Sequence, residues 1–238
     1  MLKLTEVSKK YKKRTVVDHL SFEISKGDVL GLLGSNGAGK STTISMIATL
    51  LKPDSGQILF DDVDIVRKQK QVRQKIGYVP QEIALYENLT GNDNLDFFAR
   101  AYHLTGTVMK ESLSYVKDIL GLTEAQLKEK VCFYSGGMKR RLNMGVALLH
   151  NPELLLLDEP TVGVDIESRD RILETIEELS KKGTMVIYIG HYMEEVERIC
   201  NKICIMNQGN RIIFGELQEL LELENESLEE FYKRNIDG

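Results

Sequence analysis

The stretch "GSNGAGKST" (residues 34–42) decides the fold of this chain. It fits the pattern of a glycine, four residues and then Gly-Lys-Ser that forms a phosphate-binding loop, or P-loop. An apolar strand pattern, "DVLGLLG" (28–34), precedes it and a helical pattern follows it. Glycines let consecutive N–H groups turn inward around a polyphosphate, and the N-terminus of the helix points at the same anion. We therefore expect Lys40 to reach the β- and γ-phosphates and the Ser41 hydroxyl to ligate Mg²⁺.

Two carboxylates follow a second apolar strand pattern. In "LLLLDEP" (154–160), four leucines are followed directly by Asp158 and Glu159. Ligands of open α/β sheets bind at the carboxyl ends of the strands. We expect Asp158 to hold Mg²⁺, directly or through water, and Glu159 to polarise an attacking water. A surface acidic turn without function is the alternative, and the fully apolar strand before it argues against that reading.

Two further polar residues follow apolar strand patterns. His191 comes after "TMVIYIG" (184–190), and Gln81 ends "KIGYVPQ" (75–81). The position of His191 predicts that its side chain reaches the same sheet edge as Glu159, where it is a catalytic candidate. Gln81 is uncharged and suits contact with Mg²⁺ or its water, although the local sequence alone leaves its role open.

The remaining periodicity predicts how the chain is organised. Alternating apolar residues predict antiparallel strands in 3–11 and 16–24, a hairpin segment in 56–65, and a hairpin followed by two short helices in 202–238. Helices are predicted over about 39–51 and 166–183, and three successive helical patterns without a strand fill 89–150.

These elements predict an α/β protein with a P-loop NTPase core. We expect a mostly parallel sheet, an antiparallel β subdomain and an all-helical insertion. The chain, residues 1–238, is then one domain, with its nucleotide-binding core in 1–88 and 151–238 and its helical subdomain in 89–150.

Composition excludes several classes of protein. The net charge of −5 argues against a nucleic-acid binder that works through a broad basic face, so no nucleic-acid partner is expected. No apolar run approaches the ~20 residues that span a bilayer, and the N-terminus lacks a signal-peptide pattern. We expect a cytoplasmic protein whose membrane role comes through a partner. Three cysteines, Cys132, Cys200 and Cys204, are predicted to be buried reduced thiols rather than a metal site.

A second glycine pair lies in "YSGGM" (134–138), at the start of a helical pattern. Ser135 is a good N-cap because its hydroxyl can accept a hydrogen bond from the first turn. Gly136 and Gly137 are poor helix formers, at a cost of about 1 kcal/mol each relative to alanine. Their presence indicates that something approaches the backbone closely there.

Taken together, these motifs resemble the nucleotide-binding subunit of an ATP-binding-cassette (ABC) transporter, in the family's order and over nearly the whole chain. By this resemblance "YSGGM" is the signature motif and Asp165 belongs to the D-loop. His191 is the switch histidine, Gln81 belongs to the Q-loop, and Tyr11 is the aromatic residue that stacks on adenine. The residues expected to bind ATP are Tyr11, Gly34, Ser35, Asn36, Gly37, Ala38, Gly39, Lys40, Ser41, Thr42, Ser135, Gly136, Gly137 and Asp165.

The resemblance implies a partner chain and a membrane partner. In the family two cassettes pair head to tail, and each ATP lies between the P-loop of one chain and the signature of the other. Ser135 and the two glycines would then face the γ-phosphate of a nucleotide bound by another chain. A separate integral-membrane permease is expected, with the cassette peripheral to the inner face of the cell membrane. The segments "GHYMEEVERICNKICIMNQGNRIIFGE" and "LTGNDNLDFFARAYHL" resemble exporters that include antibiotic-resistance and sodium-extrusion cassettes.

The signature departs from the family's usual Leu-Ser-Gly-Gly-Gln at Tyr134 and Met138. We expect altered rates rather than loss of function, and the strength of the dimer contact stays open. Two other functions would use part of these motifs. A soluble ABC protein acting on ribosomes or DNA resembles tandem cassettes or carries long coiled-coil arms, which this chain lacks. A small-molecule P-loop kinase would leave the signature and the switch histidine unexplained.

Overall fold

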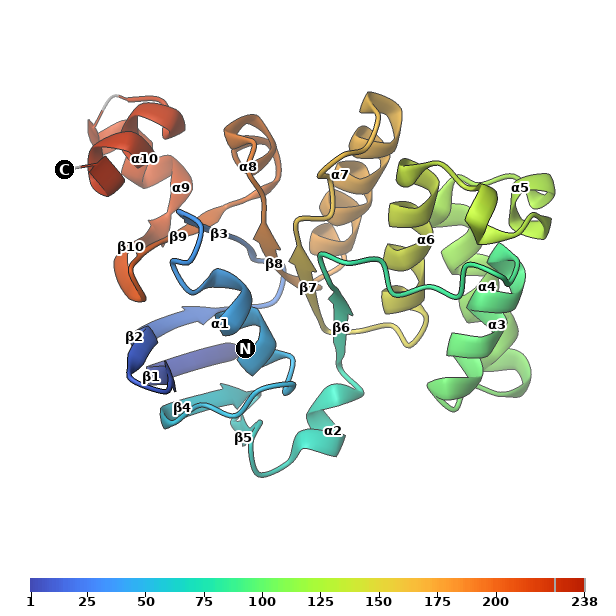
Figure 1. Cartoon of the computed structure of the whole chain (residues 1–238), viewed down its shortest axis with the longest axis horizontal. Helices are drawn as coiled ribbons and strands as arrows, with labels where there is room; N and C mark the ends of the chain where they lie inside the picture. Colours follow the sequence, from blue (N-terminus) through green and yellow to red (C-terminus); the bar gives the residue numbers. More distant parts are fainter. Residues whose placement is uncertain (225, 238) are drawn as a thin grey trace.

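The computed structural model describes residues 1–224 and 226–237 and confirms the α/β class (Figure 1). The strands form one six-stranded and one four-stranded sheet. The larger sheet contains β3 (Val29–Gly34), β6 (Ile76–Val79), β7 (Leu154–Asp158), β8 (Met185–Ile189), β9 (Lys202–Asn207) and β10 (Asn210–Glu216), in the order β10-β9-β3-β8-β7-β6.

Five of these strands pair in parallel, and only β10 is antiparallel to its neighbour β9. Every residue of β7 and β8 is buried. Continuous apolar sequences form such strands because both faces of a parallel sheet are covered. The carboxyl ends of β3, β6, β7 and β8 therefore meet at one edge, where the chain leaves toward the residues predicted to be functional.

The smaller sheet is antiparallel. Two of its strands come before the P-loop in the chain and two come after it. It contains β1 (Leu2–Tyr11), β2 (Arg14–Ile24), β4 (Ser55–Phe60) and β5 (Val63–Asp64), in the order β2-β1-β4-β5. Its apolar residues share a core with Leu32 of β3 and with Ile44 of α1 (Lys40–Ile47). The helix that follows the P-loop is thus packed into the core that the two sheets share.

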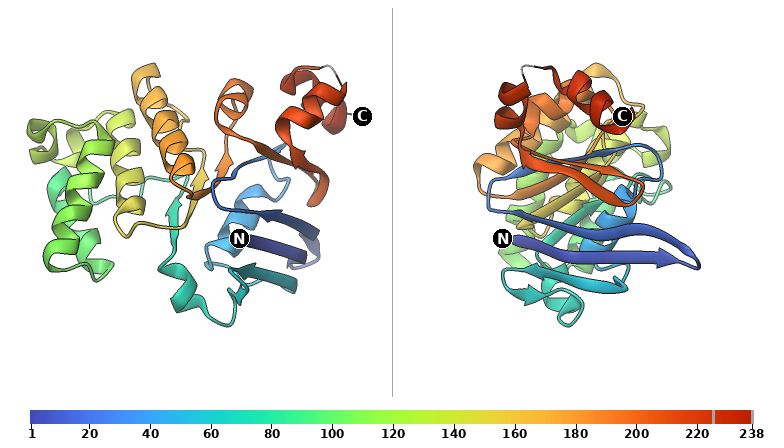
Figure 2. Two further views of the ribbon diagram at one scale, coloured as in Figure 1. Left: turned by 180° about the vertical axis from the view of Figure 1, so that it is seen from behind. Right: turned by 90° about the vertical axis from the view of Figure 1, so that its left-hand side faces the viewer.

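Helices occupy both ends of the molecule (Figures 1 and 2). One end holds α3 (Gly91–Ala101), α4 (Gly106–Leu120), α5 (Glu124–Lys128), a 3₁₀ turn (Val131–Phe133) and α6 (Gly136–Leu148). The other holds α9 (Leu217–Glu224) and α10 (Leu228–Asp237). Between the ends lie α7 (Ile166–Lys181) and α8 (Met193–Ile199), and α2 (Gln69–Arg73) precedes β6. The boundaries proposed for the helical subdomain, 89 and 150, stay a prediction.

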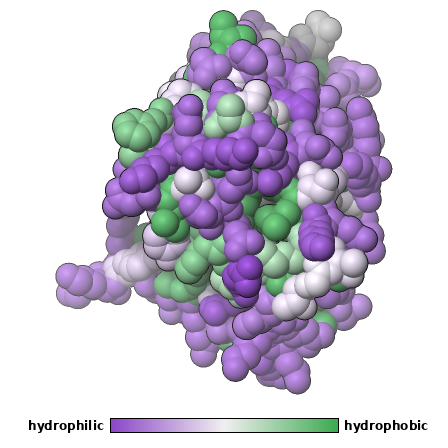
Figure 3. Space-filling model, turned by 90° about the vertical axis from the view of Figure 1, so that its right-hand side faces the viewer, coloured by the Kyte–Doolittle hydropathy of each residue, from purple (hydrophilic) through white to green (hydrophobic). Residues whose placement is uncertain are grey.

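The outer face of the helical region is mostly hydrophilic around a few apolar side chains (Figure 3). Its inner face carries Leu120 and Leu142, which belong to the same buried cluster as Leu155 and Val186 of the large sheet. Within the described ranges, no helix is both long and apolar enough to cross a membrane.

Two expectations from the sequence are wrong in detail. Helix α1 ends at Ile47 rather than near 51, because Thr49 has a φ of 60° and the chain turns there. Cys132 is exposed, since the 3₁₀ turn directs it outward. The other two cysteines are buried as predicted, and burial raises the pKa of the Cys204 thiol to about 12, so it remains protonated.

His150 joins the helical region to the large sheet. Its Nε2 donates a hydrogen bond to the carbonyl of Ile76 at 3.0 Å, and its ring stacks on Tyr102 with centroids 4.1 Å apart. Burial lowers the pKa of His150 below its ordinary value of 6.5, while the hydrogen bond to Ile76 opposes this shift. The neutral imidazole is therefore the form that this junction holds.

We expect this junction to make stability depend on pH in the weakly acidic range. The contribution of His150 is present above pH 6.5 and is lost as the pH falls through its lower folded pKa, because the unfolded chain binds the proton first. In His150→Gln the amide can still donate to Ile76 but does not titrate. Urea unfolding at about pH 7.5 and about pH 5.5 should show a smaller pH difference for the variant, the slope due to one such group being at most about 1.4 kcal/mol per pH unit. His103→Gln, at an exposed position, is the control, and equal slopes for wild type and His150→Gln would contradict the assignment.

Candidate active site

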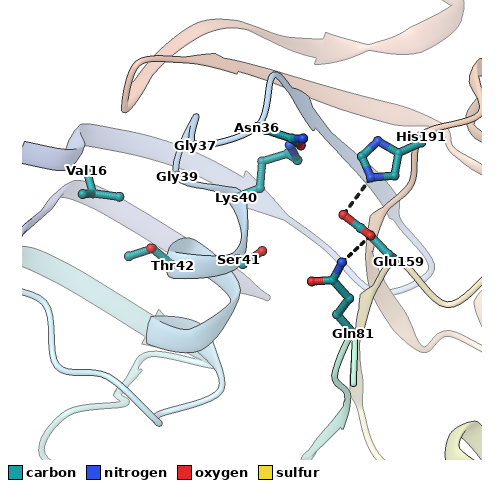
Figure 4. Close-up of a pocket in the computed structure, with 10 residues that line it drawn as sticks. All are labelled: Val16, Asn36, Gly37, Gly39, Lys40, Ser41, Thr42, Gln81, Glu159 and His191. Atoms are coloured by element: carbon teal, nitrogen blue, oxygen red, sulfur yellow. Dashed lines mark hydrogen bonds and ion pairs between the residues drawn. The ribbon is translucent and has the colours of Figure 1, made fainter. Parts of the chain in front are cut away.

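A pocket of about 530 Å³ lies at the carboxyl edge of the large sheet (Figure 4). Its walls come from β2, the P-loop with α1, and the loops after β6, β7 and β8. The lining residues are Val16, Asn36, Gly37, Gly39, Lys40, Ser41, Thr42, Gln81, Glu159 and His191. The sequence motifs predicted every one of these except Val16.

The P-loop holds the buried Lys40 against the pocket that it lines. Its Nζ donates to the carbonyls of Gly34 at 2.6 Å and Ser35 at 3.1 Å, which leaves one of its three N–H donors for a ligand. Burial lowers the pKa of Lys40, although Glu159 and Asp158 oppose the shift. Gly39 has a φ of 105°, and a Cβ there would lie 2.5 Å from the Val16 carbonyl, so no side chain fits between the loop and β2.

Asp158 and Ser41 face each other below the P-loop. Asp158 ends β7 and is buried, and the Ser41 hydroxyl donates to its Oδ1 at 3.4 Å. Burial raises the pKa of Asp158, and the hydrogen bond from Ser41 only partly offsets this. Lys40 and His191 also favour the charged form of this carboxylate, yet its pKa stays raised, so its burial is only partly compensated. A cation bound beside it would supply that compensation.

Glu159 joins the loops that follow β6, β7 and β8. Its Oε2 accepts a hydrogen bond from Gln81 Nε2, and its Oε1 accepts one from His191 Nε2, each at 2.7 Å (Figure 4). Glu159 has a φ of 53°, a left-handed conformation that is strained for a residue with a side chain. The three polar residues that the sequence placed at strand ends are therefore in contact.

Sequence comparison identifies the family to which this site belongs. The ABC transporter family model matches residues 17–162. The chain belongs to the ABC transporter ATP-binding family. It is 50% identical over 220 residues to the linearmycin resistance ATP-binding protein LnrL of Bacillus subtilis (strain 168), covering 92% of this chain and 70% of that protein.

Solved structures agree with this identification. A structure described as the ATP-binding subunit of an ABC transporter superposes with a TM-score of 0.89 and 29% identity, covering 99% of both chains. A dimeric ATP-binding cassette in a post-hydrolysis state, bound to ADP and Pi, shares the fold with a TM-score of 0.82 and 24% identity, covering 91% of this chain and 99% of that one. The chain is an ABC ATPase, which binds and hydrolyses ATP.

The residues predicted to hold Mg²⁺ fit such an ion. In the described ranges no group of three or more His, Cys, Asp or Glu side chains could hold a metal. Mg²⁺ in phosphate sites instead takes one or two protein ligands together with phosphate oxygens and waters. The buried Asp158 carboxylate, the Ser41 hydroxyl and the amide oxygen of Gln81, which points to the Ser41 side of the pocket in Figure 4, suit that arrangement. Their role as ligands stays a prediction.

The signature residues lie outside this pocket. Ser135 is the N-cap of α6, and its Oγ accepts a hydrogen bond from the Met138 N–H at 3.1 Å, as the sequence predicted. Ser135 and Gly136 are exposed and neither lines the pocket. They can contact a nucleotide only if one is brought to them from elsewhere.

The two signature glycines differ in what surrounds them. A Cβ on Gly136 would meet only the Gly163 carbonyl, at 3.4 Å. A Cβ on Gly137 would lie 2.6 Å from Ser168 Cβ and would also clash with Ser168 Oγ and Asp165. Gly137 is therefore needed for the packing of α6 against α7 in the same chain, a reason that the sequence did not reveal.

Asp165 and Tyr11, which the resemblance assigns to nucleotide binding, do not line this pocket. Asp165 is the N-cap of α7, where its Oδ1 accepts a hydrogen bond from the Ser168 N–H at 2.9 Å. Hydrogen bonds from Ser168 lower the pKa of Asp165. Tyr11 ends β1, is half exposed and does not line the pocket, which Val16 of the same hairpin does. Contacts of Asp165 and Tyr11 with nucleotide stay predictions.

The glycine pair gives a matched test of fold stability without nucleotide. Gly137→Ala should destabilise the chain by about 1–3 kcal/mol, because its Cβ overpacks the contact with α7. Gly136→Ala should be neutral or stabilising by up to about 1 kcal/mol, because alanine favours the helix. Urea unfolding of both variants measures the difference, and equal stability would show that Gly137 is not required for packing.

Proposed function

We propose that this chain is one of two ATP-hydrolysing cassettes that power a membrane-spanning exporter. The observation that carries the proposal is the separation of the two halves of the predicted ATP site. The pocket contains the P-loop, Glu159 and His191, whereas Ser135 and Gly136 lie outside it. In Figure 1, α1 and α6 lie on opposite sides of β7. A second chain that brings its own pocket to Ser135 would complete both sites.

The start of α6 suits a phosphate from that second chain. The helix has 13 residues, and its first turn carries no acidic residue. Its N-terminal N–H groups and its partial positive charge favour an anion. Because the Ser135 hydroxyl accepts from Met138, its proton remains available to donate to a phosphate oxygen. The dimeric structure with ADP and Pi, a protein of the same fold, supports a paired arrangement.

The chemistry that we assign to the pocket relies on charge and position. Bound Mg²⁺ would supply further positive charge at the phosphates. The P-loop N–H groups and Lys40 stabilise the charge that develops on the transferred phosphoryl group. Glu159 orients and polarises the attacking water, since each carboxylate oxygen has lone pairs beyond those used by Gln81 and His191. His191 holds Glu159 in place through its Nε2 and lines the same pocket.

An exposed aromatic patch in the segment that follows Gln81 suits the permease partner. Tyr86 and Phe97 are each nearly half exposed and contact each other edge to face, with ring centroids 4.8 Å apart. The fully buried Asn94 fixes this loop by accepting from the Tyr86 N–H at 2.8 Å. Exposed aromatic side chains on a fixed backbone are typical of protein interfaces. Docking there would place the cassette at the inner face of the membrane.

The direction of transport is proposed from likeness alone. LnrL is named for resistance to linearmycin. Together with the segments that resemble antibiotic-resistance and sodium-extrusion cassettes, this favours export over import. The permease, rather than this chain, would select the molecule that is moved.

Loss of the His191 imidazole should separate binding from hydrolysis. His191→Ala should bind MgATP with unchanged affinity, because the P-loop is intact, and should lose about 10²–10⁴-fold in turnover. Isothermal titration and phosphate release measure the two quantities. His103→Ala, which changes an exposed histidine that does not line the pocket, is the control. Turnover near wild type in a folded His191→Ala protein would assign the histidine a structural role only.

Trapping ATP tests the paired arrangement. Glu159→Gln keeps shape and hydrogen bonding but cannot accept a proton, so MgATP should stay bound and a dimer should accumulate on a sizing column. Gly136→Asp added to Glu159→Gln should abolish that dimer while each chain still binds ATP. The new carboxylate would lie beside the γ-phosphate, where like charges at about 4 Å repel by ~4 kcal/mol at an effective dielectric of 20. Such a change weakens association roughly a thousandfold.

Gly136→Asn in the same background is the matched control for size without charge. A Cβ at Gly136 would make only an ordinary van der Waals contact, 3.4 Å from the Gly163 carbonyl, so neither substitution should disturb the fold. The comparison uses matched protein concentration and low salt. A dimer that persists undiminished in the Gly136→Asp variant would show that the signature is not the contact between chains.

A further inference from the structure

A buried polar cluster outside the pocket joins the two loops that carry Glu159 and His191. Thr161 follows Glu159 by two residues, Tyr188 precedes His191 by three, and Glu195 follows His191 by four. Their exposed fractions are 2%, 0% and 2%. Thr161 Oγ1 donates to Glu195 Oε2 at 2.8 Å and lies 3.1 Å from the Tyr188 hydroxyl, which also donates to Glu195 Oε2.

The cluster is costly as an element of the core. Glu195 Oε1 is buried, and it has no hydrogen-bond partner within residues 1–224 and 226–237. The nearest cationic atom, Arg169 Nε, lies 3.9 Å away and is equally without a hydrogen bond in the described part of the chain. Replacing buried ionic groups with apolar residues of similar size is often neutral or stabilising. Stability of the core is therefore a weak reason for a carboxylate at this position.

The cluster lies where it can set the geometry of the site. The loops after β7 and β8 also share a backbone hydrogen bond, from Glu159 N–H to the Ile189 carbonyl at 2.9 Å. On one side of that bond, His191 Nε2 meets Glu159 Oε1; on the other, Thr161 and Tyr188 meet Glu195. Glu159 is held in a strained left-handed conformation, which persists only where its surroundings determine it strongly.

We propose that Thr161, Tyr188 and Glu195 form a polar clamp that positions His191 against Glu159. The three side chains are buried and none of them lines the pocket, so they are positioning residues. The inference rests on the proposed roles of Glu159 and His191 in hydrolysis. In this proposal the three buried side chains hold the loops after β7 and β8 in the relative position at which the His191 imidazole contacts the Glu159 carboxylate.

Near-isosteric substitutions test the clamp in the full chain. Tyr188→Phe removes one hydroxyl, and Thr161→Val removes the other while keeping the volume. Each should lower kcat for ATP about tenfold or more, since displacement of about 1 Å at a reacting group can cost 10²-fold. KM and the affinity for MgADP should not change, because the P-loop is untouched. Thr161→Ser, which restores the hydroxyl, should recover most of the lost kcat.

Thr175→Val is the matched control. Thr175 is also buried, and its hydroxyl donates to the Arg171 carbonyl within α7, away from both loops. It should leave kcat unchanged while costing similar stability. The decisive comparison repeats Tyr188→Phe in a His191→Ala background, where the clamp has no imidazole to position and should have no further effect on residual turnover.

Two results would overturn the clamp. One is an unchanged kcat in both Tyr188→Phe and Thr161→Val. The other is an equal fall in kcat with and without His191. If the wild-type chain hydrolyses ATP, either result would contradict only the clamp and would leave the proposed function supported. A wild-type chain that binds MgATP without turning it over as a dimer would remove both.

Discussion

Much of this structure depends on the parallel pairing of β7 with β8. Leu157 lies opposite Tyr188 and Asp158 opposite Ile189, and both strands are buried along their whole length. A slip of one residue would exchange the two faces of a strand, so the register is strongly specified. Because Glu159 and His191 follow these strands within two residues, the register of the core also fixes where their side chains meet.

The charged residues at this edge are desolvated before any ligand arrives. Burial lowers the pKa of Lys40 and raises the pKa of Asp158, so in each case the charged form is the one that burial penalises. A phosphate beside Lys40 and a cation beside Asp158 would remove both penalties together. The pocket is thus electrostatically complementary to a metal-bound polyphosphate. The charged groups of Lys40 and Asp158 are desolvated already when the chain folds, before the ligand binds.

The sequence predicted most of the fold because local patterns determine it. Apolar runs identify buried parallel strands, and a loop rich in glycine between a strand and a helix identifies the phosphate site. The site and packing residues that the sequence did not predict depend on tertiary packing. Val16 lines the pocket only because β2 lies along the P-loop, and Gly137 is required only because Ser168 and Asp165 pack against it.

Other misses have the same origin. Tyr188 stands in an apolar run, "TMVIYIG", where nothing local distinguishes a hydroxyl that has a buried partner from an ordinary core aromatic. Cys132 was expected inside because cysteine usually is, yet a short 3₁₀ turn faces it outward. Helix α1 ends earlier than predicted because Thr49 adopts a left-handed conformation, which the helical periodicity of the sequence does not show.

Helix α7 lies between α8, which follows the loop of His191, and α6, which begins at the signature (Figure 1). At its start, Asp165 caps the helix and packs with Ser168 against Gly137 of the signature. One turn further, Arg169 approaches Glu195, whose other oxygen is held by Thr161 and Tyr188. A contiguous set of packed side chains therefore runs from the signature to the loop of His191. Contiguity alone is not coupling, because coupling is a free energy between two sites. What the geometry shows is that α6 at Gly137 packs against Asp165 and Ser168, the cap at which α7 begins one turn before Arg169.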